Sequence, residues 1–185
     1  IFVLAAGVGA SRQAAPAAPV KPAAAGPALY RDGWIDLNKN GKKDVYEDPS
    51  LAIDRRIDDL LSQMTLDEKT CQLATLYGYN RVLKDQLPTP QWKGEVWKDG
   101  IGNIDEHCNG VRGAGKDCAL PASRHAEVIN AVQRFFIEET RLGIPADFTT
   151  EGIRGLCQWG ATSFPAQIGQ ACAWDPDLVR QIGRV

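Results

Sequence analysis

The chain has 185 residues, of which 44% are hydrophobic and 24% are charged. This length and composition are typical of a globular protein with a buried core, and they exclude collagen-like, coiled-coil and fully disordered chains. The 21 Lys and Arg residues nearly balance the 23 Asp and Glu residues, leaving a net charge of −2, so we expect no nucleic acid as partner. A complete (β/α)8 barrel needs roughly 250 residues, so any barrel here is part of one.

The first 29 residues are expected to precede the folded domain. Residues 1–10 form a short apolar run that ends in small residues, which is typical of a signal-peptide remnant; a buried apolar strand is the alternative. The run is shorter than the roughly 20 residues of a membrane-spanning helix, so no membrane span is expected. Residues 11–29 are rich in Ala and Pro and are predicted to be a linker. Together these features predict a secreted or periplasmic protein.

A calcium-loop pattern lies within the next segment, residues 30–49. Residues 36–47 fit D-x-[DN]-x-[DN]-G-x5-E at every specified position. Oxygen donors at this spacing, with a sharp turn at the glycine, are what a hard cation with six to eight oxygen ligands needs. We expect a structural Ca²⁺ bound by the side chains of Asp36, Asn38, Asn40, Asp44 and Glu47 and by the carbonyl of Lys42.

A solvated turn without an ion is the alternative interpretation of this loop. Lys39, Lys42 and Lys43 dilute its negative charge, and no amphipathic helix precedes it, so it is a lone loop and not a paired EF-hand. We therefore expect modest affinity and a role in stability, since a calcium switch needs a second element that moves.

Two consecutive helices are predicted where the main domain, residues 50–185, begins. Ser50 is a candidate N-cap for a helix whose apolar residues recur at helical spacing from Ile53 to Met64. Residues 65–68 have the capping-box sequence Thr-Leu-Asp-Glu, which predicts a second helix that includes Leu76.

Residues 100–185 alternate predicted strands and helices. We expect strands at 100–104 and 144–149, a helix at 123–141 that ends before Gly143, and a final helix with Asp175 as its N-cap. The helix 123–141 is predicted to bury Ala126, Val128, Ile129, Val132, Phe135 and Phe136. This order predicts βαβ units in a parallel sheet, hence the α/β fold class.

The cysteines and histidines show no zinc-binding spacing. Cys108 and Cys118 flank a glycine-rich loop, so either a disulfide or two separate thiols is expected there. We interpret His107 and His125 as surface residues or as residues with local hydrogen bonds, and we propose no metal site for them.

Four motifs, in order, resemble the start of the catalytic domain of glycoside hydrolase family 3, the family of β-glucosidases, β-xylosidases and related exo-acting enzymes. They lie at residues 59–69, 141–145, 160–169 and 173–179. The resemblance implies a (β/α)8-like (TIM) barrel, of which the chain contains the first two or so βα units. We therefore interpret it as an amino-terminal fragment.

The resemblance also implies a sugar-binding role for residues that follow the strand 144–149. In the family, a carboxylate at the position of Glu151 accepts hydrogen bonds from hydroxyls of the terminal sugar, and Arg154 stands where many members have His. Both are candidate substrate-binding residues, although without the family they read as a surface ion pair. Trp159 and Trp174 are expected to be buried instead of lining a sugar site.

The catalytic pair of a retaining glycosidase is not assigned within this chain. In the family the nucleophile and the acid/base residue lie further along, beyond residue 185. The implied activity is exo-acting hydrolysis of terminal β-linked sugars in oligosaccharides, disaccharides or aryl β-glycosides, in which the remainder of the polypeptide takes part and catalysis needs no cofactor. The alternative is a calcium-stabilised, non-catalytic carbohydrate-binding or cell-surface module.

Overall fold

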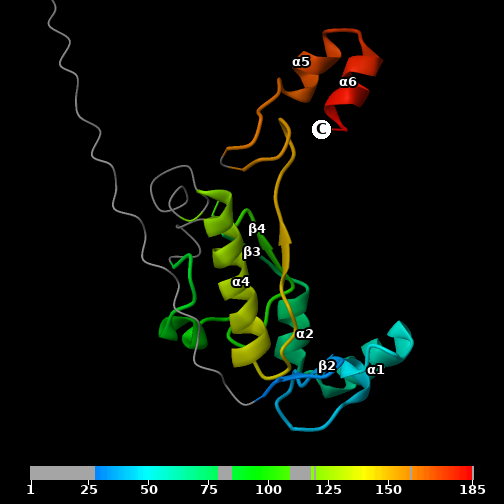
Figure 1. Cartoon of the computed structure of the whole chain (residues 1–185), viewed down its shortest axis with the longest axis vertical. Coiled ribbons are helices and arrows are strands. Elements are labelled where there is room, and N and C mark those ends of the chain that lie inside the picture. Colours follow the sequence, from blue (N-terminus) through cyan, green and yellow to red (C-terminus); the bar gives the residue numbers. More distant parts are fainter. Residues whose placement is uncertain (1–27, 79–84, 109–117, 119, 159, 185) are drawn as a thin grey trace, which may run out of the picture.

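The computed structural model describes residues 28–78, 85–108, 118, 120–158 and 160–184. It is a mixed α/β structure with a two-stranded antiparallel sheet and a three-stranded parallel sheet (Figure 1), which confirms the predicted α/β class. The predicted signal remnant and almost all of the predicted linker lie outside the described residues. No helix within the described ranges combines the length and the apolar character needed to cross a membrane.

The amino-terminal segment forms a small hairpin followed by a loop and two helices. Strands β1 (Tyr30–Arg31) and β2 (Trp34–Ile35) pair antiparallel. The 3-10 helix η1 (Val45–Glu47) closes the loop, and the helices α1 (Ile53–Gln63) and α2 (Leu66–Gln72) follow. The first strand begins next to Leu29, which is buried.

The start of α1 differs from the prediction. Its N-cap is Ala52, and the Ser50 hydroxyl instead donates to Asp48 Oδ1 at 2.7 Å. The Ser50 backbone N–H donates to the same carboxylate, so Ser50 belongs to a turn that precedes the helix. The apolar residues of α1 keep their helical spacing, yet Ile53 and Ile57 remain exposed.

The parallel sheet contains β3 (Thr75–Tyr77), β4 (Asn103–Asp105) and β5 (Asp147–Thr149), in that order. The prediction of helix through Leu76 was wrong, because α2 stops at Gln72 and Leu76 instead pairs with Ile104 in the sheet. The backbone at Gly102 passes very close to the end of α2, and only glycine fits there, because a Cβ would lie 2.2 Å from the Gln72 carbonyl oxygen.

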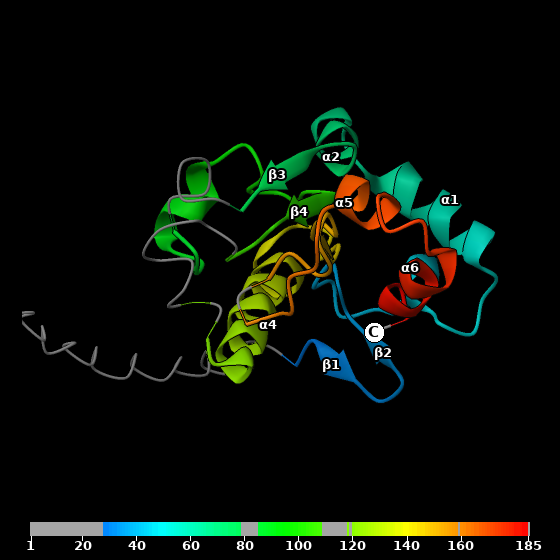
Figure 2. The ribbon, with the colours of Figure 1, turned by 90° about the horizontal axis from the view of Figure 1, so that it is seen from above.

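One helix, α4 (Ala122–Glu139), covers one face of the sheet, as Figure 2 shows from above. It buries Val128, Val132, Phe135 and Phe136, as predicted. Ala126 is exposed and Ile129 only half-buried, which corrects two of the predicted core positions. Both lie nearer the start of α4 than the aromatic pair Phe135 and Phe136.

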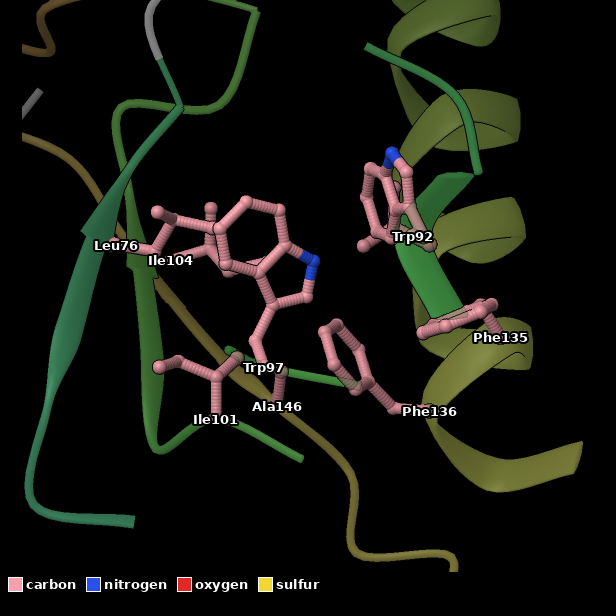
Figure 3. Close-up of a cluster of buried hydrophobic side chains, with 9 residues drawn as sticks. Leu76, Trp92, Trp97, Ile101, Ile104, Phe135, Phe136 and Ala146 are labelled. Carbon is pink, nitrogen blue, oxygen red and sulfur yellow. The ribbon is translucent and has the colours of Figure 1, made fainter. Parts of the chain in front are cut away.

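The main core lies between α4 and the sheet and is built on aromatic side chains (Figure 3). Trp97 lies between the strand residues and α4 in this view. Trp92, which is provided by the 3-10 helix η2 (Pro90–Gly94), makes edge-on contacts with Trp97 and Phe135 at centroid distances of 6.2 and 5.2 Å. Such edge-to-face pairs add to the hydrophobic stabilisation that burial of the rings provides.

Two short helices, α5 (Gln167–Ala171) and α6 (Pro176–Ile182), contact each other beyond the end of β5 (Figure 1). Asp175 is the N-cap of α6, as predicted, because its side chain accepts from the N–H groups of Asp177 and Leu178. Helix α5 was not predicted. Trp174 is 91% exposed, so the expectation that it is buried was wrong.

A buried carboxylate ties α2 to the end of α4. The Thr65 backbone N–H donates to Glu68 Oε2, which completes the predicted capping box, and Arg141 Nε donates to Glu68 Oε1 at 2.9 Å. Burial raises the pKa of Glu68, but the hydrogen bonds from Arg141 and Thr65 outweigh this effect and hold the pKa below its usual value. Glu68 is therefore charged at neutral pH and supports both helices.

Replacing Glu68 with Gln should lower the free energy of unfolding by about 1–3 kcal/mol, because Arg141 loses its charged partner while staying half exposed to water. Urea denaturation of the full-length protein, followed by tryptophan fluorescence, measures this change. The exposed residue Asp67, in the same helical turn, is the matched control, and its change to Asn should cost less than about 0.5 kcal/mol. Equal effects of the two changes would contradict the role given to Glu68.

Candidate sugar-binding site and calcium loop

The face of the sheet opposite α4 is polar. Its residues are exposed or half-buried, and near the carboxyl ends of the strands they form a hydrogen-bonded group: Thr149 Oγ1 lies 2.7 Å from Asp105 Oδ1 and 3.1 Å from Asn103 Oδ1. The residues on this face are Thr75, Tyr77, Asn103, Asp105, Asp147 and Thr149. Ligands of open or closed parallel sheets bind at the carboxyl ends of the strands.

Glu151 lies in the irregular segment that follows β5, Arg154 lies in a turn of this segment, and both side chains are exposed. Their backbone carbonyls are held, since Glu151 O accepts from Cys157 N–H at 2.8 Å and Arg154 O accepts from Phe164 N–H at 2.7 Å. No ion pair joins Glu151 and Arg154, which both lie within the described residues. The structure therefore does not support the alternative that they form a surface ion pair with each other. Trp159 lies outside the described residues.

A cavity of about 260 Å³ lies beside this segment, between the start of α4 and the end of β5. His107 is one of its walls and is 97% buried; its Nε2 lies 2.9 Å from the Gln86 carbonyl oxygen. The expectation of a surface residue is wrong for His107, and its hydrogen-bond partner Gln86 lies 21 residues away along the chain instead of nearby. The cavity is lined by His107, His125, Ile129, Phe148, Thr149, Thr150, Leu156 and Gln158.

Cys108 and Cys118 lie close together next to this cavity. They are thiols in this structure, and a hydrogen bond joins them. This hydrogen bond and burial both raise the pKa of the Cys108 thiol. Of the two alternatives predicted for this pair, the structure therefore shows thiols in contact.

The calcium-loop residues are brought together as the sequence predicts. Asp36 is 97% buried, and its Oδ2 accepts from Gly41 N–H at 3.0 Å. Glu47 is also buried, and its two oxygens accept from the N–H groups of Leu37, Asn38 and Asp44. These bonds fold residues 36–47 into a closed loop around its acidic side chains.

The remaining predicted ligands complete the loop. The side-chain amides of Asn38 and Asn40 both donate to Asp44 Oδ2, at 2.5 and 2.6 Å. Lys42 is exposed, and its N–H donates to Asn40 Oδ1. Within the described residues, no group of three or more His, Cys, Asp or Glu side chains lies close enough to hold a metal. A cation site in this loop therefore requires the asparagines as well as the carboxylates.

Comparison with known proteins finds relatives that are named as glycosidases. "Putative beta-xylosidase" of Formosa agariphila is 31% identical over 146 residues, which are 74% of this chain and 17% of that protein. "Probable beta-glucosidase C" of Aspergillus oryzae is 29% identical over 163 residues, 83% of this chain and 24% of that protein. About three quarters of the chain or more is thus similar to part of proteins named as glycoside hydrolases. "Beta-glucosidase C" of Emericella nidulans, 30% identical over 154 residues, agrees with this assignment.

The chain spans less than a quarter of the length of these curated relatives. No protein-family model matches it. The relatives confirm the resemblance to a glycosidase family that the four motifs indicated. The small share of each relative that is covered is consistent with a catalytic pair that lies outside this chain.

Sequence reasoning missed two features of the strand ends. The first is the polar group of Asn103, Asp105 and Thr149, which requires knowledge of the register between β4 and β5. The second is the burial of His107, because Gln86, which accepts its hydrogen bond, lies 21 residues away along the chain. In the sequence, the only indication of the polar group was a polar residue at the end of each predicted parallel strand.

The buried His107 ring should make stability depend on pH. Burial lowers the pKa of His107 to about 4, whereas the imidazole of an unfolded chain has a pKa of about 6.5. Between these values the unfolded state binds the extra proton, so the free energy of unfolding should fall as the pH drops from 6.5 towards 4, by about 3 kcal/mol at most. NMR titration of the full-length protein should find the ring neutral at pH 5. A ring that titrates near pH 6.5, as in a histidine peptide measured beside it, would contradict this.

Proposed function

We propose that the full-length protein hydrolyses terminal non-reducing β-linked sugars as an exo-acting, β-glucosidase-like enzyme with a retaining mechanism. The observation that carries the proposal is the position of Glu151: it follows the carboxyl end of β5, next to a polar sheet face, in a chain whose relatives are named as β-glucosidases and a β-xylosidase. The expected substrates are oligosaccharides, disaccharides and aryl β-glycosides.

The parallel sheet is proposed to be the first part of a (β/α)8-like barrel. Its strands are adjacent in chain order, and α4 connects β4 to β5 across one face, as in a βαβ unit. The opposite face is open and polar in the described residues, as expected for a face that lines a barrel interior near a substrate site. We place the start of this domain at residue 50, after the linker of residues 11–29 and the loop segment of residues 30–49.

Glu151 is proposed to bind the sugar that is cleaved off. A carboxylate only accepts hydrogen bonds, and its two oxygens can hold two neighbouring sugar hydroxyls at once. Side chains alternate along an extended chain, so Glu151 falls on the same side as Thr149, which faces Asp105. Arg154, three residues further on, is proposed to shape the same pocket.

The chemical step is proposed to belong to residues outside this chain. A retaining glycosidase needs a carboxylate nucleophile and a second carboxyl group as acid and then base, about 5–5.5 Å apart. Catalysis requires no cofactor, and a Ca²⁺ held by residues 36–47 is structural. We further propose a secreted or periplasmic location, because residues 1–10 have the composition of a signal-peptide remnant.

Replacing Glu151 with Gln should lower kcat/KM for an aryl β-glycoside by about 100-fold or more, because the hydrogen bonds from the sugar lose their charged acceptor. Aryl β-glucoside and aryl β-xyloside are assayed with the full-length protein. Glu151→Asp should retain more activity than Glu151→Gln. The matched control is Glu139→Gln, an exposed carboxylate in α4 that pairs with Lys93 and should leave kcat/KM unchanged.

Two outcomes of this assay would contradict different parts of the proposal. A wild-type protein that hydrolyses a β-glycoside, with a Glu151→Gln variant of equal kcat/KM, would overturn the role of Glu151 alone. A wild-type protein that binds saccharides without cleaving any β-glycoside would overturn the glycosidase and favour the non-catalytic binding module.

A further inference from the structure

We infer that residues 36–47 form a calcium site whose occupancy stabilises the carboxyl-terminal end of α4. This inference deepens the proposed structural Ca²⁺ and rests on it, but it does not depend on the proposed glycosidase activity. It joins three observations: an acceptor atom in the loop that lacks a partner, nearby cations that leave this atom unpaired, and a lysine that links the loop to α4.

The first observation is a buried carboxylate oxygen. Asp36 Oδ1 has no hydrogen-bond partner, although the side chain is almost completely buried. The other oxygen, Oδ2, accepts from Gly41 at the middle of the loop, so the carboxylate points into the loop. Burying an acceptor without a partner costs about 1–3 kcal/mol, more when it is charged, unless a ligand fills its place. A bound cation satisfies this atom.

The second observation concerns the cations that dilute the charge of the loop. Lys39 donates to backbone carbonyls and Lys43 Nζ pairs with Asp48 at 3.0 Å, outside the ligand set. Arg31 approaches Asp36 only on its Oδ2 side, at 3.6 Å, and leaves Oδ1 unpaired. The carboxylates of Asp44 and Glu47 form no ion pair with a described cation. No described cation therefore neutralises the carboxylates of Asp44 and Glu47, although both accept hydrogen bonds within the loop.

The chemistry of the donor set favours calcium. All its side-chain donors are carboxylate or amide oxygens, which are ligands for hard cations and not for zinc or copper. Calcium accepts six to eight oxygens in flexible arrangements, whereas magnesium requires a near-ideal octahedron and keeps several waters. A loop with three carboxylates and two amides thus fits calcium better, with a dissociation constant on the order of 10⁻⁴–10⁻³ M, typical of extracellular modules.

The third observation is the path from the loop to α4. Lys39, in the middle of the loop, has a φ of 61°, and its Nζ donates to the carbonyls of Ile137 and Thr140 at 2.7 and 2.5 Å. These carbonyls belong to the end of α4, which has no basic residue in its own last turn. A cation at this position compensates the negative end of the helix dipole. An ion that fixes the loop therefore also fixes the lysine that caps α4.

The stabilisation of α4 by bound Ca²⁺ is expected at the amino end of the sheet, away from Glu151. The hairpin and the loop lie by the last turn of α4, whereas the segment after β5 lies at the other end of the strands (Figure 1). Residues 140–146 connect the capped end of α4 to β5. Calcium should thus protect the α4–β5 turn without contact with the proposed sugar site.

The site itself is tested by isothermal titration of the full-length protein with CaCl₂. We expect one Ca²⁺ per chain, no comparable binding of MgCl₂, and at least tenfold weaker Ca²⁺ binding in Asp36→Asn and in Glu47→Gln. Both variants are checked for native circular dichroism, and one folded variant suffices. Asp32→Asn is the matched control, an exposed carboxylate in the β1–β2 turn that should bind as the wild type does. No binding of Ca²⁺ by the wild type overturns the site.

The link to α4 is tested by hydrogen exchange of the amides of residues 137–146, with CaCl₂ and with EGTA. Calcium should slow their exchange at least tenfold in the wild type. In Lys39→Met, Ca²⁺ binding should persist while this protection is lost. An equal gain of protection in Lys39→Met overturns the link and leaves the site intact. Glycosidase activity is not the readout, so failure here is distinct from failure of the proposed function.

Discussion

The last turn of α4 and the turn after it hold together segments that are far apart in the sequence. Lys39 donates to two carbonyls of this region, the Tyr46 hydroxyl donates to the Leu142 carbonyl, and Arg141 pairs with Glu68. The Tyr30 hydroxyl adds a hydrogen bond to Glu138. Strand β1, the loop, η1 and α2 are thus bonded to the same few residues. The orientation of α4 on the sheet depends on these bonds as well as on its aromatic core.

The two ends of the parallel strands differ in how their polar groups are paired. At the amino end of the strands, buried charges and backbone carbonyls are paired, which is a requirement of stability. At the carboxyl end, side chains such as Asp105 and Thr149 bond to each other on an open face, and Glu151 and Arg154 remain exposed. Barrel enzymes divide their two faces in the same way, with stability at the amino end and binding at the carboxyl end.

The sequence predicted best those features that depend on neighbouring residues. The capping box at Thr65, the N-cap at Asp175 and the hydrogen-bonded loop of residues 36–47 all follow from local hydrogen bonds, and all are present. The α/β class followed from the order of the elements. The candidate site residue Glu151 was proposed through resemblance to a family, because its position at a strand end has no local signature.

What the sequence could not predict depends on long-range contacts. Leu76 has the spacing of a helix residue, but its pairing with Ile104 makes it part of a strand. His107 is buried by residues distant in the chain, and Trp174 is exposed where its size alone favours burial. Ser50 is an acceptable N-cap in isolation, yet Asp48 competes for its hydroxyl. At these positions the structure depends on the surroundings of the residue in the fold, which local sequence patterns do not show.

The turn after α4 also limits which residues the chain tolerates there. Gly143 is buried with a φ of 60°, and a Cβ on it would lie 2.6 Å from the Leu37 carbonyl oxygen and 2.9 Å from the Ile137 carbonyl oxygen. Any side chain at this position would have to displace the calcium loop from the end of α4. Which residues are tolerated at position 143 therefore depends on the position of Leu37, about a hundred residues earlier in the chain. A substitution of Gly143 would require a compensating change in the loop around Leu37.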